Sequence, residues 1–154
     1  MNGGIIVENQ KDNSSKNKEI LLAQWQTCVE MANATSQRRD AMNNVFVTLN
    51  LAIITAVSLV WEIKSLIILI AGIVVCIIWL QFIRNFRLLN SAKFNVINEL
   101  EKQLPTSPFK DEWDELKRIK KYHEGTNLER ILPYMFIGLY FLTGAIIVYF
   151  KLKK

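Results

Sequence analysis

Residues 44–61 read NVFVTLNLAIITAVSLVW, and residues 65–83 read SLIILIAGIVVCIIWLQFI. Each run is close to the ~20 apolar residues that a helix needs to cross the hydrocarbon core of a bilayer. Lipid offers no hydrogen-bond partner to a bare backbone, and the runs are continuous rather than alternating, so we predict two membrane-spanning helices. Only Glu62, Ile63 and Lys64 separate them. The two helices must therefore be antiparallel and return the chain to the side on which it began.

A third apolar run, residues 131–150, reads ILPYMFIGLYFLTGAIIVYF and predicts a third crossing. With 154 residues in the chain, three spans leave no room for a second globular unit of typical size. The fold class expected is an all-α integral membrane protein with three transmembrane helices. The first ten residues have no basic region followed by a long apolar core, so the first span is expected to act as the insertion signal.

The distribution of Lys and Arg predicts the orientation in the membrane. Residues 1–43 carry 5 of the 19 and residues 84–130 carry 10, whereas the loop at Lys64 and the basic tail 151–154 carry the other 4. The N-terminus and the 84–130 region are therefore expected in the cytoplasm. The acidic residues lie mostly on the same side, so this surface has little excess charge and does not indicate nucleic-acid binding.

The segments outside the bilayer are predicted to be mostly helical. Residues 1–15 lack hydrophobic periodicity and are expected to form a flexible tail, and residues 16–43 form an amphipathic helix on the pattern Leu21, Trp25, Cys28, Val29, Ala32. No Gly or Pro occurs between Ile5 and Ala71, so this helix should continue into the first span. The second span should likewise continue toward Pro105.

A further cytoplasmic helix is expected to begin at the pair Ser107 and Pro108, typical of an N-cap and a first turn. Its predicted buried face is Phe109, Trp113, Leu116 and Ile119, and Gly125 is expected to end it. Thr126 and Glu129 resemble a capping box before the third span. The long helical extensions should pack into a cytoplasmic bundle and, between copies, into an oligomeric ring.

The first span carries one stripe of small and polar residues at steps of three or four. Its members are Asn44, Thr48, Ala52, Thr55, Leu59 and Glu62. In membranes such a stripe lies where helices approach closely or where water is tolerated, so it is a candidate helix interface or pore lining. Asn50 points away from it and is interpreted as an interhelical hydrogen-bonding residue.

The second span is apolar all round, apart from Gly72 and Cys76. These form a small-xxx-small pair that allows close packing. Trp61 and Trp79, near the two ends of the hairpin, are interpreted as interfacial anchors.

The sequence offers little chemistry for catalysis. The single histidine, His123, stands in a charged turn, and Cys28 and Cys76 lie in different compartments and indicate packing rather than a disulfide. No cluster has metal-ligand spacing, and we expect no cofactor. The acidic run from Asp111 to Glu115 is interpreted as a solvated helix face, with a cation or basic partner as the alternative. We therefore expect no enzymatic activity.

Two stretches carry a resemblance to a known family: QRRDAMNNVFVTLN from Gln37 to Asn50, and IRNFRLLNSAKFNVINELEKQLPTSPFKDEW ending at Trp113. They resemble the RipA-type octameric membrane protein family of bacteria over most of residues 20–150. The resemblance implies a protein of the bacterial cytoplasmic (inner) membrane that assembles as a homo-octamer, and it brings no catalytic residues. Its motif supplies a candidate cytoplasmic assembly motif: Arg38, Arg39, Arg87, Asn90, Lys93, Phe94, Glu101 and Trp113.

The function expected is that of a non-enzymatic homo-oligomer in the lipid bilayer, a pore or channel-like assembly lined by the first span. The alternative is a scaffold or regulator, for example a stress or phage-defence effector, that recruits an unidentified protein partner and conducts nothing. Liposome flux distinguishes the two.

Overall fold

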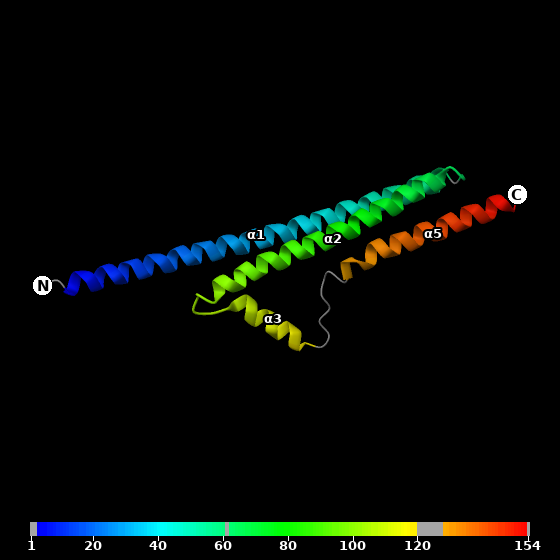
Figure 1. The fold of residues 1–154 in the computed structure, drawn as a ribbon. Helices are drawn as coiled ribbons and strands as arrows, with labels where there is room; N and C mark the ends of the chain where they lie inside the picture. The colour runs from blue at the N-terminus through cyan, green and yellow to red at the C-terminus, as the bar shows by residue number, and fades with distance from the viewer. Residues whose placement is uncertain (1–2, 61, 120–127, 154) are drawn as a thin grey trace. The chain divides into compact units, whose positions relative to one another are not determined.

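The computed structural model describes residues 3–60, 62–119 and 128–153, with side chains from Ser15 onward. It contains the helices α1 (Gly3–Val60), α2 (Ser65–Glu101), α3 (Pro108–Arg118) and α5 (Ile131–Leu152), and no strand in these ranges (Figure 1). Three of the helices, α1, α2 and α5, are long and apolar enough to cross a membrane. The prediction of an all-α membrane protein is therefore confirmed.

Both α1 and α2 continue far beyond the apolar runs. α1 has 58 residues and α2 has 37, whereas a span needs only ~20. The prediction that the absence of Gly and Pro keeps each helix unbroken is confirmed. The predicted tail over residues 1–15 needs correction, because α1 begins at Gly3. After Gly4 this segment has no residue that ends a helix, and low periodicity alone does not prevent one.

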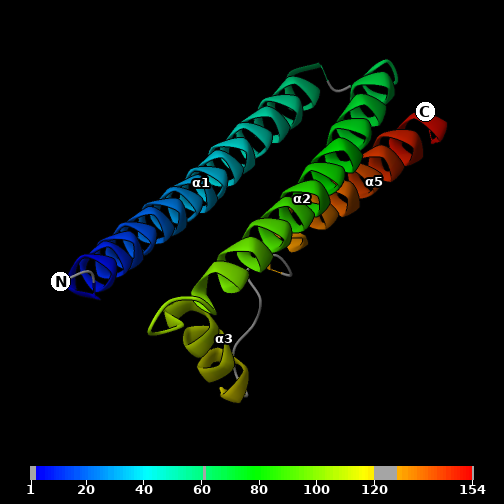
Figure 2. The same cartoon turned by 60° about the vertical axis from the view of Figure 1, so that its left-hand side comes forward.

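A tight turn joins α1 to α2 and reverses the chain (Figure 2). The backbone N–H groups of Ser65, Leu66 and Ile67 donate to the carbonyls of Glu62, Ile63 and Lys64 at 2.9–3.2 Å. The Ser65 hydroxyl also accepts from the backbone N–H of Glu62 at 3.2 Å. Ser65 thus satisfies backbone groups at the start of α2, which would be costly to leave unpaired near lipid.

The chain divides into two compact units. Unit 1 comprises Met1–Thr35 and Asn90–Tyr122, and unit 2 comprises Ser36–Leu89 and His123–Lys154. The apolar spans lie in unit 2, and unit 1 holds the charged extensions of α1 and α2 together with α3.

The core of unit 2 lies where α1, α2 and α5 meet. One buried cluster joins Val57, Leu69, Cys76, Tyr140 and Ile147, and a second joins Phe46, Trp79 and Ile83. On α2 the buried positions follow steps of four and three residues, through Ser65, Leu69, Gly72, Cys76, Trp79 and Ile83. On α5 they recur every seven residues, at Pro133, Tyr140 and Ile147. Such spacing is typical of helices that pack nearly parallel along a continuous seam.

In unit 1 the start of α3 is fixed by the end of α2. Glu101 is buried, and its carboxylate accepts hydrogen bonds from the backbone N–H groups of Phe109 and Lys110, at 3.2 and 3.3 Å. Ser107 occupies the N-cap position as predicted, but its side chain makes no capping hydrogen bond. The carboxylate of Glu101 therefore takes the role assigned to Ser107, with the added attraction between an anion and the positive end of a helix.

The predicted buried face of α3 is only partly correct. No residue of α3 is buried; Phe109 and Leu116 are half-buried, whereas Trp113 and Ile119 are 43% and 51% exposed. The helix ends at Arg118. The predicted stop at Gly125 and the cap at Thr126 fall outside the described residues.

Candidate functional site

Asn50 is the centre of a buried polar network that joins the three spans. Its side-chain oxygen accepts hydrogen bonds from the Tyr140 hydroxyl of α5 at 2.6 Å and from the Cys76 thiol of α2 at 3.1 Å. Its side-chain nitrogen donates to the carbonyl of Phe46, one turn back on α1, at 2.7 Å. Asn50, Cys76 and Tyr140 are each at most 1% exposed. The interpretation of Asn50 as an interhelical hydrogen-bonding residue is confirmed, and the network fixes the alignment of the spans.

Gly72 allows α5 to approach α2 at the level of this network. A Cβ atom added to Gly72 would lie 2.7 Å from two ring carbons of Tyr140. By contrast, Gly138 has no neighbouring atom within 4 Å of such a Cβ. The predicted close packing at the Gly72 and Cys76 pair is therefore present, and the ring of Tyr140 fills the space that Gly72 leaves.

Trp79 lies inside the helix bundle and not at the lipid surface. Its side chain is 0% exposed, stacks on Phe46 with ring centroids 5.6 Å apart, and donates from Nε1 to the Asn43 side-chain oxygen at 2.8 Å. The interpretation of Trp79 as an interfacial anchor is therefore wrong. Trp79 follows Cys76 by three residues, so the buried seam of α2 carries it inward. Trp61 is outside the described residues.

The predicted stripe of the first span lies on the outside of unit 2. Asn44, Thr48, Ala52 and Thr55 are all exposed, and Glu62 is exposed in the turn before α2. The hydroxyls of Thr48 and Thr55 donate to the carbonyls four residues earlier, those of Asn44 and Leu51, each at 2.9 Å. The stripe is thus not used in packing α1 against α2 or α5, and its polar groups are satisfied within α1 itself.

The residues of the predicted assembly motif do not form one cluster. Arg38, Arg39 and Arg87 belong to unit 2, and Asn90, Lys93, Phe94, Glu101 and Trp113 belong to unit 1. Arg39 forms an ion pair with Glu129, Nε to Oε1 at 3.3 Å, which links α1 to the segment before α5. Glu101 caps α3, as described above. Arg39 and Glu101 of the motif therefore make contacts within one copy, a role that the sequence pattern did not predict.

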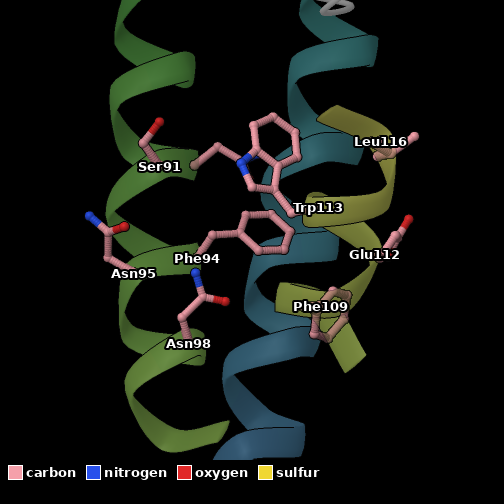
Figure 3. A pocket seen from close by; sticks show the side chains of 9 residues that line it. Ser91, Phe94, Asn95, Asn98, Phe109, Glu112, Trp113 and Leu116 are labelled. Carbon is pink, nitrogen blue, oxygen red and sulfur yellow. The ribbon is translucent and has the colours of Figure 1, made fainter. Parts of the chain in front are cut away.

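Three motif residues line a pocket of unit 1 between α2 and α3. The pocket has a volume of about 470 Å³. Its walls are Asn90, Ser91, Phe94, Asn95 and Asn98 from α2, and Phe109, Glu112, Trp113 and Leu116 from α3. Figure 3 shows the Phe94 and Trp113 rings between the two helices. Phe94 packs edge-on against Phe109, with ring centroids 5.6 Å apart, and Phe109 also contacts Trp25 of α1 at 5.9 Å. We call this pocket the α2–α3 groove.

The groove is lined by aromatic rings and side-chain amides. Asn90 contributes a buried side-chain oxygen that receives no hydrogen bond from the described residues. Glu112 supplies one carboxylate, and the neighbouring acids Asp111, Asp114 and Glu115 are exposed to solvent, as the sequence predicted for this face. Within the described ranges, no three His, Cys, Asp or Glu residues come together as a metal site.

Three apolar helices packed around a buried polar network, with charged helical extensions, define a multi-pass α-helical membrane protein. The chain matches the model of the octameric membrane protein family (8xMP) over residues 22–150, and it belongs to that family. The match agrees with the resemblance drawn from residues 20–150. A homo-oligomeric membrane assembly is consistent with this membership. Searches of curated proteins and of solved structures gave no match.

Proposed function

We propose that the protein is a non-enzymatic homo-oligomer of the bacterial inner membrane, with its N-terminus in the cytoplasm, that forms a pore or channel-like assembly lined by α1. The observation that carries the proposal is the exposure of the stripe Asn44, Thr48, Ala52 and Thr55 on unit 2. The other two spans leave this face of α1 free. The family is described as octameric, and in a ring of eight copies the stripe can face the axis and line a conduit with threonine side chains.

The physical reason for assigning this face to the axis is its polarity. Outside the stripe, the exposed surface of the spans is made mainly of large apolar residues suited to lipid, such as Ile67, Phe141 and Ile70 at 73%, 65% and 61% exposed. Asn44 and Thr48 would gain less from lipid than these residues do. Contact with water or with another protein copy suits them better.

A second candidate is supported by the hydrogen bonds of the same stripe. The hydroxyls of Thr48 and Thr55 both donate to carbonyls of their own helix, at 2.9 Å. Their donors are therefore committed, as suits a dry contact between helices. On this reading the protein is a membrane scaffold or regulator that recruits a partner and conducts nothing.

Ion flux through liposomes that contain the purified assembly distinguishes the two functions. A pore should leak ions, and Thr48→Leu or Thr55→Leu should reduce the flux, because each introduces a larger apolar side chain on the lining. Thr143→Leu on α5 is the matched control and should leave the flux unchanged. A fully assembled sample that carries no flux under voltage, pH or ligand challenge would instead favour the scaffold.

A further inference from the structure

α1 carries an uncharged stripe in its water-exposed part, before the span begins. We call it the α1 ridge, and it comprises Ile20, Ala23, Thr27, Met31 and Ala34. All five are exposed, Ile20 and Met31 at 49% and 52%. The Thr27 hydroxyl donates to the carbonyl of Ala23 at 2.9 Å, so Thr27 presents its methyl group. An unbroken uncharged stripe on a helix rich in Lys and Glu indicates a surface that another protein covers.

The α1 ridge lies on a different side of α1 from the face that packs inside unit 1. The inward face comprises Leu21, Trp25, Cys28, Ala32 and Thr35, which are buried or half-buried. At ~100° per residue, the centres of the two faces are roughly 120° apart around the helix. The ridge and the α2–α3 groove are therefore two different surfaces of one unit, one convex and one concave.

The symmetry of a closed ring explains why each copy has two such surfaces. A closed ring of identical copies uses heterologous contacts, in which one surface of each copy meets a different surface of the next. The family to which the chain belongs is described as octameric. A ring of eight therefore needs two unlike, complementary surfaces, and unit 1 provides an apolar ridge and an aromatic groove.

The two surfaces also lie at the same level along the helices. Trp25 of α1 and Phe94 of α2 both contact Phe109, so the ridge around Thr27 is level with the groove around Phe94. Rotation about an axis parallel to the helices of unit 1 keeps every residue at its level along them. With such an axis, a ridge meets the groove of the next copy without any shift along the helices.

Charge at the margins fits the same contact. Lys16 is exposed and lies four residues before Ile20, on the same side of α1 as the ridge. The groove wall carries Glu112, and α3 adds the exposed Asp111, Asp114 and Glu115. We propose that the α1 ridge of one copy inserts into the α2–α3 groove of the next copy, and that this head-to-tail contact closes the cytoplasmic ring. The proposal rests on the self-assembly in the proposed function and not on conduction.

Disulfide cross-linking of the full-length protein in its own membranes tests the contact. In a Cys28→Ala background, Met31→Cys is placed on the ridge and Leu116→Cys on the groove wall. After oxidation, the chain with both cysteines should form a ladder of species that extends past the dimer. Each single variant should give no dimer, because identical positions do not meet in a head-to-tail contact. Membranes in which a Met31→Cys copy and a Leu116→Cys copy are produced together should give dimers only.

The matched control replaces Met31→Cys with Asn33→Cys, an exposed residue roughly 200° further round the helix. The proposal is overturned if this control forms an equal ladder, if the double variant forms none, or if Met31→Cys alone gives the dimer. Native mass measurement on the same samples shows whether the protein is assembled. An oligomer without a ladder therefore rejects the ridge contact and leaves the proposed function standing.

A second variant tests the contact without new bonds. Met31→Asp places a charge on an exposed position, so the isolated copy should keep its fold, which helical content by circular dichroism checks. The assembled fraction should fall by about tenfold or more, as expected for a charge buried at the centre of an interface. Asn33→Asp should leave the assembled fraction unchanged. An unchanged assembled fraction in Met31→Asp would overturn the proposal.

Discussion

The Tyr140 hydroxyl donates a 2.6 Å hydrogen bond to the side-chain oxygen of Asn50, across 90 residues of sequence and between two membrane spans. Both side chains are at most 1% exposed. Cys76 of the remaining span donates to the same oxygen. A single amide thus satisfies polar groups from all three spans, and a rotation of any span within unit 2 would break at least one of these bonds.

Replacement of Asn50 should destabilise unit 2 more than replacement of either donor. Asn50→Leu removes the side-chain oxygen that accepts from the Tyr140 hydroxyl and the Cys76 thiol, so the free energy of unfolding should fall by about 1–3 kcal/mol. Tyr140→Phe removes one donor and should cost only about 0.6 kcal/mol, typical of interhelical hydrogen bonds in membranes. Unfolding by SDS in mixed micelles measures both values. Asn44→Leu, an exposed residue on the same helix, is the control and should stay within about 0.5 kcal/mol of the parent protein when the copies are monomeric.

Addition of one methyl group at Gly72 should disturb the same region. In Gly72→Ala the new Cβ would lie 2.7 Å from the Tyr140 ring, so α2 and α5 must separate or the ring must move. We expect a loss of about 1–3 kcal/mol in the free energy of unfolding. Gly138→Ala, where no atom lies within 4 Å, should be neutral or slightly stabilising. If Gly72→Ala is harmless, or if Tyr140→Ala in the same chain does not reduce its effect, the close approach is not what constrains this position.

Most of the helical architecture could be predicted from the sequence. The long apolar runs and the absence of Gly and Pro over most of α1 and α2 are local features, and each one acts on the backbone where it occurs. The pair Ser107 and Pro108 likewise marked the start of α3. The bounds of the helices follow from such local rules, with the main difference at Gly3.

Interactions between distant segments were harder to predict, as Trp79 and Glu101 show. A tryptophan near the end of an apolar run is typical of a membrane interface. However, Trp79 follows Gly72 and Cys76 at the four- and three-residue spacing of the buried seam. This spacing was the sequence feature that could have predicted its burial. For Glu101 the sequence offered no comparable signal, because a carboxylate caps the next helix only if the turn 102–107 brings it there.

Loss of the Glu101 carboxylate should loosen α3. Glu101→Gln keeps the size of the side chain but replaces one acceptor oxygen by a donor, facing the N–H groups of Phe109 and Lys110. α3 should lose about 0.5–2 kcal/mol of local stability, measured as faster amide hydrogen exchange over residues 109–118. Ser107→Ala should leave this exchange unchanged, since the Ser107 side chain makes no capping bond. Equally faster hydrogen exchange in both variants would mean that the Ser107 side chain caps α3 as well.

The orientation of the spans can be measured by cysteine labelling in intact bacteria. If the excess of Lys and Arg in residues 1–43 and 84–130 holds these segments in the cytoplasm, Lys64→Cys should react with an impermeant maleimide added outside, because Lys64 is exposed in the turn between α1 and α2. Asp114→Cys, exposed on α3, should react only after the membrane is permeabilised.

Three spans place the last residues opposite the N-terminus, so Lys153→Cys should react from outside together with Lys64→Cys. Labelling of Asp114→Cys from outside, with no labelling of Lys64→Cys, would mean that the protein has the opposite orientation. The α1 ridge and the α2–α3 groove would then lie on the outer side. Labelling of Lys64→Cys without Lys153→Cys would mean that α5 does not cross the bilayer, because the two sites would then lie on opposite sides.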